Sequence, residues 1–110
     1  MDNNADGKKK YILIYEGGAS AKDQAGRKMQ MEAWDKWFGG LGSDLVDGGF
    51  PFMTGAMMTD GKAQMKSEVP VSGYSIIKAD NYKAAMAKAM TCPVTMAGAK
   101  IHVFEAASMM

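Results

Sequence analysis

Short apolar runs separated by polar and glycine-rich segments predict four β-strands. Residues 10–16 (KYILIYE) and 71–78 (VSGYSIIK) combine β-branched and aromatic side chains, and residues 100–105 (KIHVFE) form a similar run towards the C-terminus. A shorter apolar run at residues 44–47 is closed by two glycines, which mark the turn after a further strand. We therefore expect one sheet whose strands come from both halves of the chain.

A helical repeat of apolar residues follows the first strand. Residues 21–41 are expected to form an amphipathic helix that is capped by Ser20 and stopped by Gly39 and Gly40. Its apolar stripe recurs every three or four residues and consists of Met31, Trp34, Phe38 and Leu41. Trp37 lies beside this stripe and widens it.

A second helix follows the strand at residues 71–78 in the same way. Asp80 is expected to cap it, because a carboxylate can accept hydrogen bonds from the first backbone N–H groups of a helix. Pro93 cannot continue a helix and therefore limits its length. The inward face of this helix is expected to consist of Tyr82, Ala85, Met86, Ala89 and Met90.

The middle of the chain carries a hairpin signal. Residues 52–59 form an apolar run, and Asp60 and Gly61 follow it directly. This dipeptide favours a tight turn, because both of its positions can adopt positive φ. We expect the chain to return through residues 62–66 as the second strand of the hairpin.

The order of these elements is strand, helix, strand, hairpin, strand, helix, strand. It predicts a single α+β domain over residues 9–110, with a ferredoxin-like antiparallel sheet, both helices on one face and an inserted hairpin. Residues 1–8 are polar and are expected to form a flexible tail.

Both faces of this sheet are predicted to be apolar. In the first strand Tyr11, Leu13 and Tyr15 alternate with Ile12 and Ile14. Two helices can cover only one face, so we expect the sheet of a second copy to cover the other around a two-fold axis. The alternative is a monomer whose outer face carries scattered apolar side chains.

The composition argues against several partners and sites. Thirteen basic and 12 acidic side chains leave a net charge of +1, and a single arginine, Arg27, argues against a nucleic-acid reader. We expect no membrane partner and no signal peptide, because no apolar run has the required length. Cys92 is the only cysteine, which excludes an intrachain disulfide and favours a reducing, cytoplasmic location.

Several stretches of the chain together resemble a known family. They read KYILIYEGG, WDKWFGGLG, LVDGGFPF and SGYSIIKADNYKAAMAKAMTCP, with an Asp-Gly hairpin before the last. Over residues 10–106 the chain resembles the YCII-related family, also called the DGPF-domain proteins. This family is similar in fold to the dimeric α/β barrels, in which two ferredoxin-like protomers join their sheets and leave a cleft for a small molecule. The resemblance therefore implies a homodimer with such a cleft.

The chain departs from the family's pattern at two places. Some members carry a histidine near the first helix that pairs with an aspartate and is proposed to act in catalysis. This chain has Asp23, Gln24 and Arg27 in that region. The name-giving DGPF signature is replaced by Asp-Gly-Lys-Ala at residues 60–63. A hydrolytic activity is therefore not implied for this chain.

Three polar side chains are candidates for acid–base chemistry. His102 is the only histidine, the residue type that ordinarily serves as a general acid or base, although a packed or surface histidine is the alternative interpretation. Asp47 precedes two glycines and can present a carboxylate to a ligand or simply make a turn. Tyr74 can orient a carbonyl group, or it can be buried and bonded to the backbone.

No cofactor and no metal are expected. Structural metal sites need several histidine or cysteine donors at short spacing, and this chain has one of each. Its twelve methionines are interpreted as flexible core filler rather than as copper ligands, because they lack the tight repeats of a copper motif.

Three functions are compatible with these residues. The first is a small homodimeric binding domain for an apolar or aromatic metabolite, with Asp47 near a cleft that is lined by Tyr15, Trp37, Phe50, Tyr74 and His102. The second is an isomerase- or monooxygenase-like acid–base enzyme that acts on a small carbonyl compound through His102 or Asp47, with Tyr74 polarising the oxygen. The third is a non-catalytic regulatory interaction protein. The sequence leaves open which of these applies and which ligand is bound.

Overall fold

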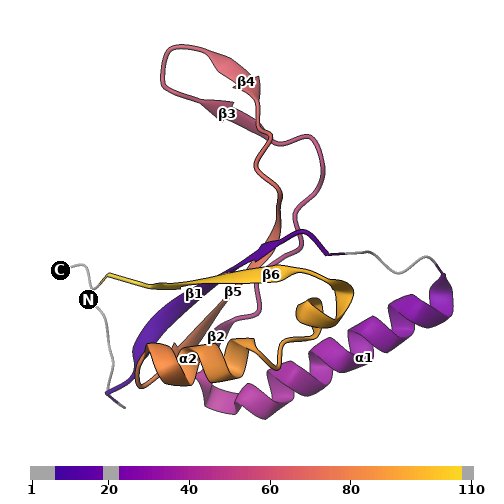
Figure 1. Ribbon diagram of the computed structural model, residues 1–110, viewed down its shortest axis with the longest axis vertical. Helices are drawn as coiled ribbons and strands as arrows, with labels where there is room; N and C mark the ends of the chain where they lie inside the picture. The colour runs from indigo at the N-terminus through magenta and orange to yellow at the C-terminus, as the bar shows by residue number, and fades with distance from the viewer. Residues whose placement is uncertain (1–6, 19–22, 108–110) are drawn as a thin grey trace.

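The computed structural model describes residues 7–18 and 23–107 of this 110-residue chain. Two strand–helix–strand units flank a hairpin (Figure 1). The main sheet contains β1 (Lys9–Glu16), β2 (Leu45–Asp47), β5 (Val71–Ala79) and β6 (Lys100–Glu105). The helices are α1 (Gln24–Leu41) and α2 (Tyr82–Ala89), with short 3₁₀ helices η1 (Gly42–Asp44) and η2 (Pro93–Ala97). The hairpin strands are β3 (Met57–Thr59) and β4 (Gln64–Lys66).

The main sheet is antiparallel and has the strand order β2-β5-β1-β6. Strands β1 and β5 occupy its centre, and both helices lie on the same side of it (Figure 1). The predicted α+β fold, with a four-stranded antiparallel sheet and two helices, is therefore confirmed. Strand β6 spans the residues predicted for it, and β5 extends one residue further than predicted.

The core lies between the sheet and the helices. Tyr11, Leu13 and Ile77 are fully buried there, and α2 packs closely because it presents the small side chains of Ala85 and Ala89. The predicted inward face of α2 was wrong for Met86 and Met90, which are 42% and 73% exposed. Tyr82 is half-exposed but does face the sheet, because its ring packs edge-on against Tyr11 and its hydroxyl accepts from the Glu105 N–H at 2.8 Å.

The other side of the main sheet, the open face, is not covered by either described helix (Figure 1). Strand alternation places on it Ile12, Ile14, Tyr74, Ile76, His102 and Phe104. Their register puts them in adjacent rows, with Ile14 opposite both Tyr74 and His102. The same alternation places charged residues at the ends of this face, namely Lys10, Glu16, Lys78 and Lys100. The prediction of a second apolar face therefore holds for its centre only.

The ends of the helices differ from the predictions. Helix α1 begins at Gln24, and the Asp23 carboxylate caps it by accepting from the N–H of Gly26 at 2.7 Å. The predicted cap, Ser20, lies outside the described residues. The helix continues through both glycines that were expected to stop it and ends before Gly42, whose φ is +55°. Helix α2 is capped by Asn81 instead of Asp80.

The folded domain begins nearer the N-terminus than predicted. The Lys8 Nζ lies 2.8 Å from one carboxylate oxygen of Asp44, and the Lys88 Nζ lies 3.0 Å from the other. The hydrogen bond from Lys8 is the main reason that the pKa of Asp44 is lowered. Lys8, which was expected to belong to the tail, is thus fixed to the body of the domain. Asp44 itself was predicted to start a strand and instead ends η1.

The predicted hairpin is present as a separate two-stranded sheet. Its turn is longer than the Asp-Gly pair implied, because four residues, 60–63, connect Thr59 to Gln64. Only Gly61 of the predicted pair has positive φ, and the Asp60 carboxylate holds the loop by accepting from the backbone N–H groups of Lys62 and Ala63. The first strand is regular only over Met57–Thr59, a shorter span than predicted.

Candidate functional site

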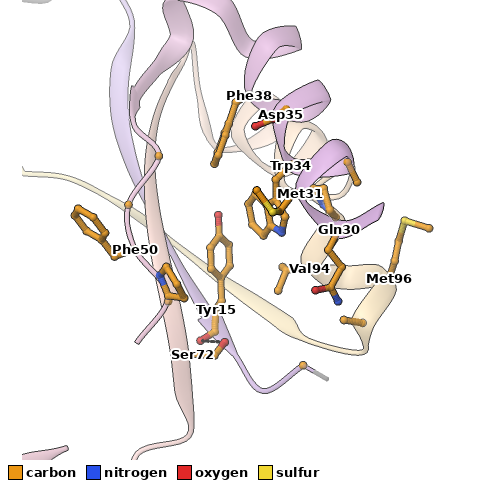
Figure 2. Close-up of a pocket in the computed structure, with 18 of the residues that line it drawn as sticks. Tyr15, Gln30, Met31, Trp34, Asp35, Phe38, Phe50, Ser72, Val94 and Met96 are labelled. Atoms are coloured by element: carbon orange, nitrogen blue, oxygen red, sulfur yellow. Dashed lines mark hydrogen bonds between the residues drawn. The ribbon is translucent and has the colours of Figure 1, made fainter. Parts of the chain in front are cut away.

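A groove of about 850 Å³ lies beside the main sheet. Its walls are the N-terminal half of α1, the short helix η2, parts of β1 and β5, and the loop of residues 48–51. Figure 2 shows the ring of Tyr15 rising between this loop and α1, with Val94 of η2 on the far side. We call this space the aromatic groove.

Three aromatic rings from two elements form one wall of the groove. The ring centre of Trp34 lies 5.6 Å from that of Tyr15 and 5.4 Å from that of Phe38. Both distances fall within the range at which tilted and edge-to-face aromatic pairs attract one another. Trp34 and Phe38 share a helix face because they are four residues apart. The wall is therefore a packed aromatic surface on the side of the groove.

The rim of the groove is apolar and exposed. Four of its side chains are 67–89% exposed: Met29, Met31, Phe50 and Met96. Met31 was predicted to belong to the core stripe of the first helix, but the N-terminal half of α1 extends past the sheet, which leaves nothing to bury it (Figure 1). Methionine side chains adapt to ligands of different shape, so this rim suits an apolar molecule.

Beneath the aromatic wall, buried polar groups bond to one another. The Cys92 thiol donates to the Tyr15 hydroxyl at 3.9 Å, which donates to the Ser75 hydroxyl at 2.6 Å. Ser75 in turn donates to the Gly48 carbonyl at 2.7 Å. Burial raises the pKa of both Tyr15 and Cys92, so both are neutral at physiological pH. The chain of bonds thus fixes the Tyr15 ring against the groove without placing a charge there.

The groove offers few charges to a ligand. Asp35 is the one charged side chain among the described residues that line it, and it is exposed. The carboxamide of Gln30 and the hydroxyl of Ser72 add neutral polar groups, and Ser72 donates to the Tyr15 carbonyl at 3.4 Å (Figure 2). An apolar space with a few polar groups at its edge is typical of pockets for small molecules.

The loop that closes one side of the groove depends on glycine. Gly49 has φ of +76°, and a Cβ there would overlap the Tyr74 carbonyl oxygen. Asp47 accepts from the Gly49 N–H at 2.8 Å, which holds the turn. The turn interpretation of Asp47 therefore agrees with the structure, and this turn is what positions Phe50 at the rim.

The structure distributes the five predicted cleft residues between two faces of the sheet. Tyr15 and Phe50 line the aromatic groove. Tyr74 also borders it, although strand alternation places the Tyr74 side chain on the open face. Trp37 does not line it; it lies in the core, where its indole N–H donates to the Thr91 hydroxyl at 3.0 Å. His102 projects from the open face and does not line the groove either.

The three candidates for acid–base chemistry do not meet in one space. The Tyr74 hydroxyl donates to the Asp47 carboxylate at 3.1 Å, and this bond raises the pKa of Tyr74. His102 Nε2 instead lies 2.7 Å from a carboxylate oxygen of Glu16. Tyr74 and His102 are separated by Ile14 on the strand between them, so about 10 Å divides their backbones.

Three residues of the groove were not predicted from the sequence: Trp34, Val94 and Gln30. Trp37 was expected to form the pocket wall because it lies beside the apolar stripe, but the structure buries Trp37 and leaves Trp34 on the wall. The apolar run that follows Pro93 was the available signal for Val94, because such a run after a helix needs a surface to pack on.

Other kinds of site find little support in the described part of the chain. No group of three or more histidine, cysteine, aspartate or glutamate side chains gathers there as metal ligands would. None of its helices is both long and apolar enough to cross a bilayer.

Comparisons with known proteins leave the family open. No protein-family model matches the chain, and a search of curated proteins finds no significant match.

Proposed function

We propose that this chain is a small homodimeric domain, YCII-related in type, that binds a small apolar or aromatic metabolite in the aromatic groove. The observation that carries the proposal is the wall of Tyr15, Trp34 and Phe38 facing a space of about 850 Å³. This volume falls within the usual range for small-molecule pockets, and the methionine rim can close over a bound molecule.

The open face supports the dimeric part of the proposal. It carries large apolar side chains that stay accessible, among them Phe104, which is 55% exposed. A second copy of the same sheet, about 10 Å away, would cover these side chains. The arrangement agrees with the dimeric α/β barrel that the resemblance implies.

Binding can be tested with the neutral fluorescent probe N-phenyl-1-naphthylamine. We expect its fluorescence to rise on titration with the protein, and a matched pair of variants locates the site. Met31→Ala removes a rim side chain and should weaken probe binding several-fold, whereas Met90→Ala removes an equally exposed methionine outside the groove and should not. Equal binding by both variants would place the probe elsewhere and contradict the proposed site.

A thermal-shift screen then addresses the natural ligand. A ligand present at 100 times its dissociation constant stabilises the native state by about 2.7 kcal/mol. Small aromatic and apolar metabolites should raise Tm, and Phe50→Ala should reduce the shift because Phe50 lines the groove while being 70% exposed. If no compound of this class shifts Tm, the regulatory interaction protein becomes the better description.

One contact favours the acid–base enzyme as a second candidate. The Glu16 carboxylate orients the His102 ring at 2.7 Å, an arrangement that suits a general base. On this hypothesis His102 moves the proton of a small carbonyl compound held between two copies. If an isomerase-type activity is unchanged in the His102→Ala variant, the enzyme hypothesis is contradicted for His102. The Asp47→Asn variant tests, in the same assay, the other residue that was predicted to move the proton.

A further inference from the structure

Residues 53–69 form a hairpin arm that extends away from the body of the domain (Figure 1). All six strand residues of the arm are exposed. A two-stranded hairpin is only marginally stable in water by itself and needs a packing surface. The arm is therefore a folded element without its packing surface.

The arm has one apolar face and one mixed face. Met58 and Met65 pair directly across the two strands, so their side chains lie together on one face. The opposite face carries Met57, Thr59, Gln64 and Lys66. Met58 is 47% and Met65 38% exposed. The methionine face of the arm is therefore suited to pack against another apolar surface, whereas the mixed face is suited to contact water.

The arm rises on the same side of the sheet as the open face. Figure 1 shows the helices on one side of the main sheet and the arm extending away on the other. At the base of the arm Phe52 stacks on Tyr74 of the open face, with ring centres 6.0 Å apart. The base of the arm is thus anchored to the open face.

We propose that the arm clasps a second copy of this chain, the copy that lies against the open face in the proposed homodimer. From Phe52 to the turn at Asp60 an extended chain reaches up to about 25 Å. Two packed sheets are only about 10 Å apart, so the arm passes the partner's sheet and lays its methionine face along the partner's side. Each copy contributes one arm, as a two-fold axis requires.

The inference rests on the proposed homodimer, and charge variants of the arm separate the two. Met58→Glu together with Met65→Glu places two charges on the apolar face without touching the core. Met57→Glu together with Gln64→Glu adds the same charge to the opposite face as a control. We expect the first pair to weaken the dimer at least tenfold and the second to weaken it less than threefold, measured by analytical ultracentrifugation.

Photo-crosslinking adds a direct readout that does not depend on affinity. p-Benzoylphenylalanine at position 58 should yield a product of twice the chain mass, whereas the same group at the exposed position 90 should not. Suppose that the wild type is a dimer, that position 58 gives no crosslinked product, and that both pairs of charge variants dimerise with equal affinity. The proposed contact of the arm would then be wrong, while the homodimer would stand. If the wild type is a monomer, both the homodimer and the contact of the arm are wrong.

Discussion

The two faces of the main sheet are made by the same strands but meet different surroundings. On the helix side Tyr11, Leu13 and Ile77 are fully buried. On the open side, equally large apolar side chains from the same strands stay partly exposed, including Ile14 and Phe104. The covered face therefore accounts for the stability of the fold, and the uncovered apolar surfaces are where binding is expected.

The largest expected effect comes from equivalent truncations on the two faces. Leu13→Ala should lower the free energy of unfolding by about 3 kcal/mol, because it leaves a cavity in a fully packed core. Ile12→Ala, one residue earlier and on the open face, should cost about 1 kcal/mol in the monomer. Urea unfolding at submicromolar concentration measures both, and equal losses would contradict the assignment of the faces.

The loop between the faces gives the next largest effect. Gly49→Ala should destabilise the domain by about 2 kcal/mol or more, because the new Cβ would meet the Tyr74 carbonyl oxygen. Gly61→Ala is the control, since Gly61 also has positive φ but faces open space in the arm, and it should cost about 1 kcal/mol. Thermal unfolding followed by circular dichroism compares them, and a Gly49→Ala variant as stable as wild type would contradict the close approach.

The ion cluster around Asp44 should have a smaller effect that depends on pH. Asp44→Asn should cost about 1 kcal/mol at neutral pH, because both lysines are about a third exposed and water screens the pair. The native pKa is lowered, so the stabilisation is present above the ordinary value of 3.8 and is lost as pH falls below it. Urea unfolding at pH 7 and pH 3 should show the difference between variant and wild type shrinking at pH 3. A difference that grows on acidification would contradict this sign, and Asp80→Asn is the exposed control.

The smallest effect distinguishes the tyrosines of the two faces. Tyr15→Phe should cost about 1 kcal/mol, because it breaks the buried chain of hydroxyl groups through Ser75. Tyr74→Phe should lower the free energy of unfolding by less, because water can replace the lost hydroxyl as hydrogen-bond donor to the partly exposed Asp47. Chemical unfolding of the two variants side by side gives the comparison, and a larger loss for Tyr74→Phe would reverse it.

Local patterns in the sequence were enough to predict most of the fold. The alternation in residues 71–78 and 100–105 specified strands and faces, because a period of two depends only on neighbouring residues. Helix ends were less predictable. Asp80 and Asn81 are both good caps, and the extended φ and ψ of Asn81 decide between them.

The candidate site was only partly predictable from the sequence. Tyr15 and Phe50 were expected and do line the groove. The sequence could not show that Trp34 lines the groove in place of Trp37, because the burial of each tryptophan depends on where the sheet ends beneath α1. His102 was expected in the same cleft as Tyr15 but lies on the open face. Its separation from the groove follows from the tertiary arrangement, which one sequence does not specify.

The central claim is that a second copy of this chain covers the open face. Size-exclusion chromatography with light scattering at micromolar concentration tests it most directly. We predict a mass of twice the chain for the wild type and of one chain for Ile14→Glu, which places a charge at the centre of the open face while keeping the circular dichroism of the fold. A wild-type protein that elutes with the mass of one chain would contradict the claim.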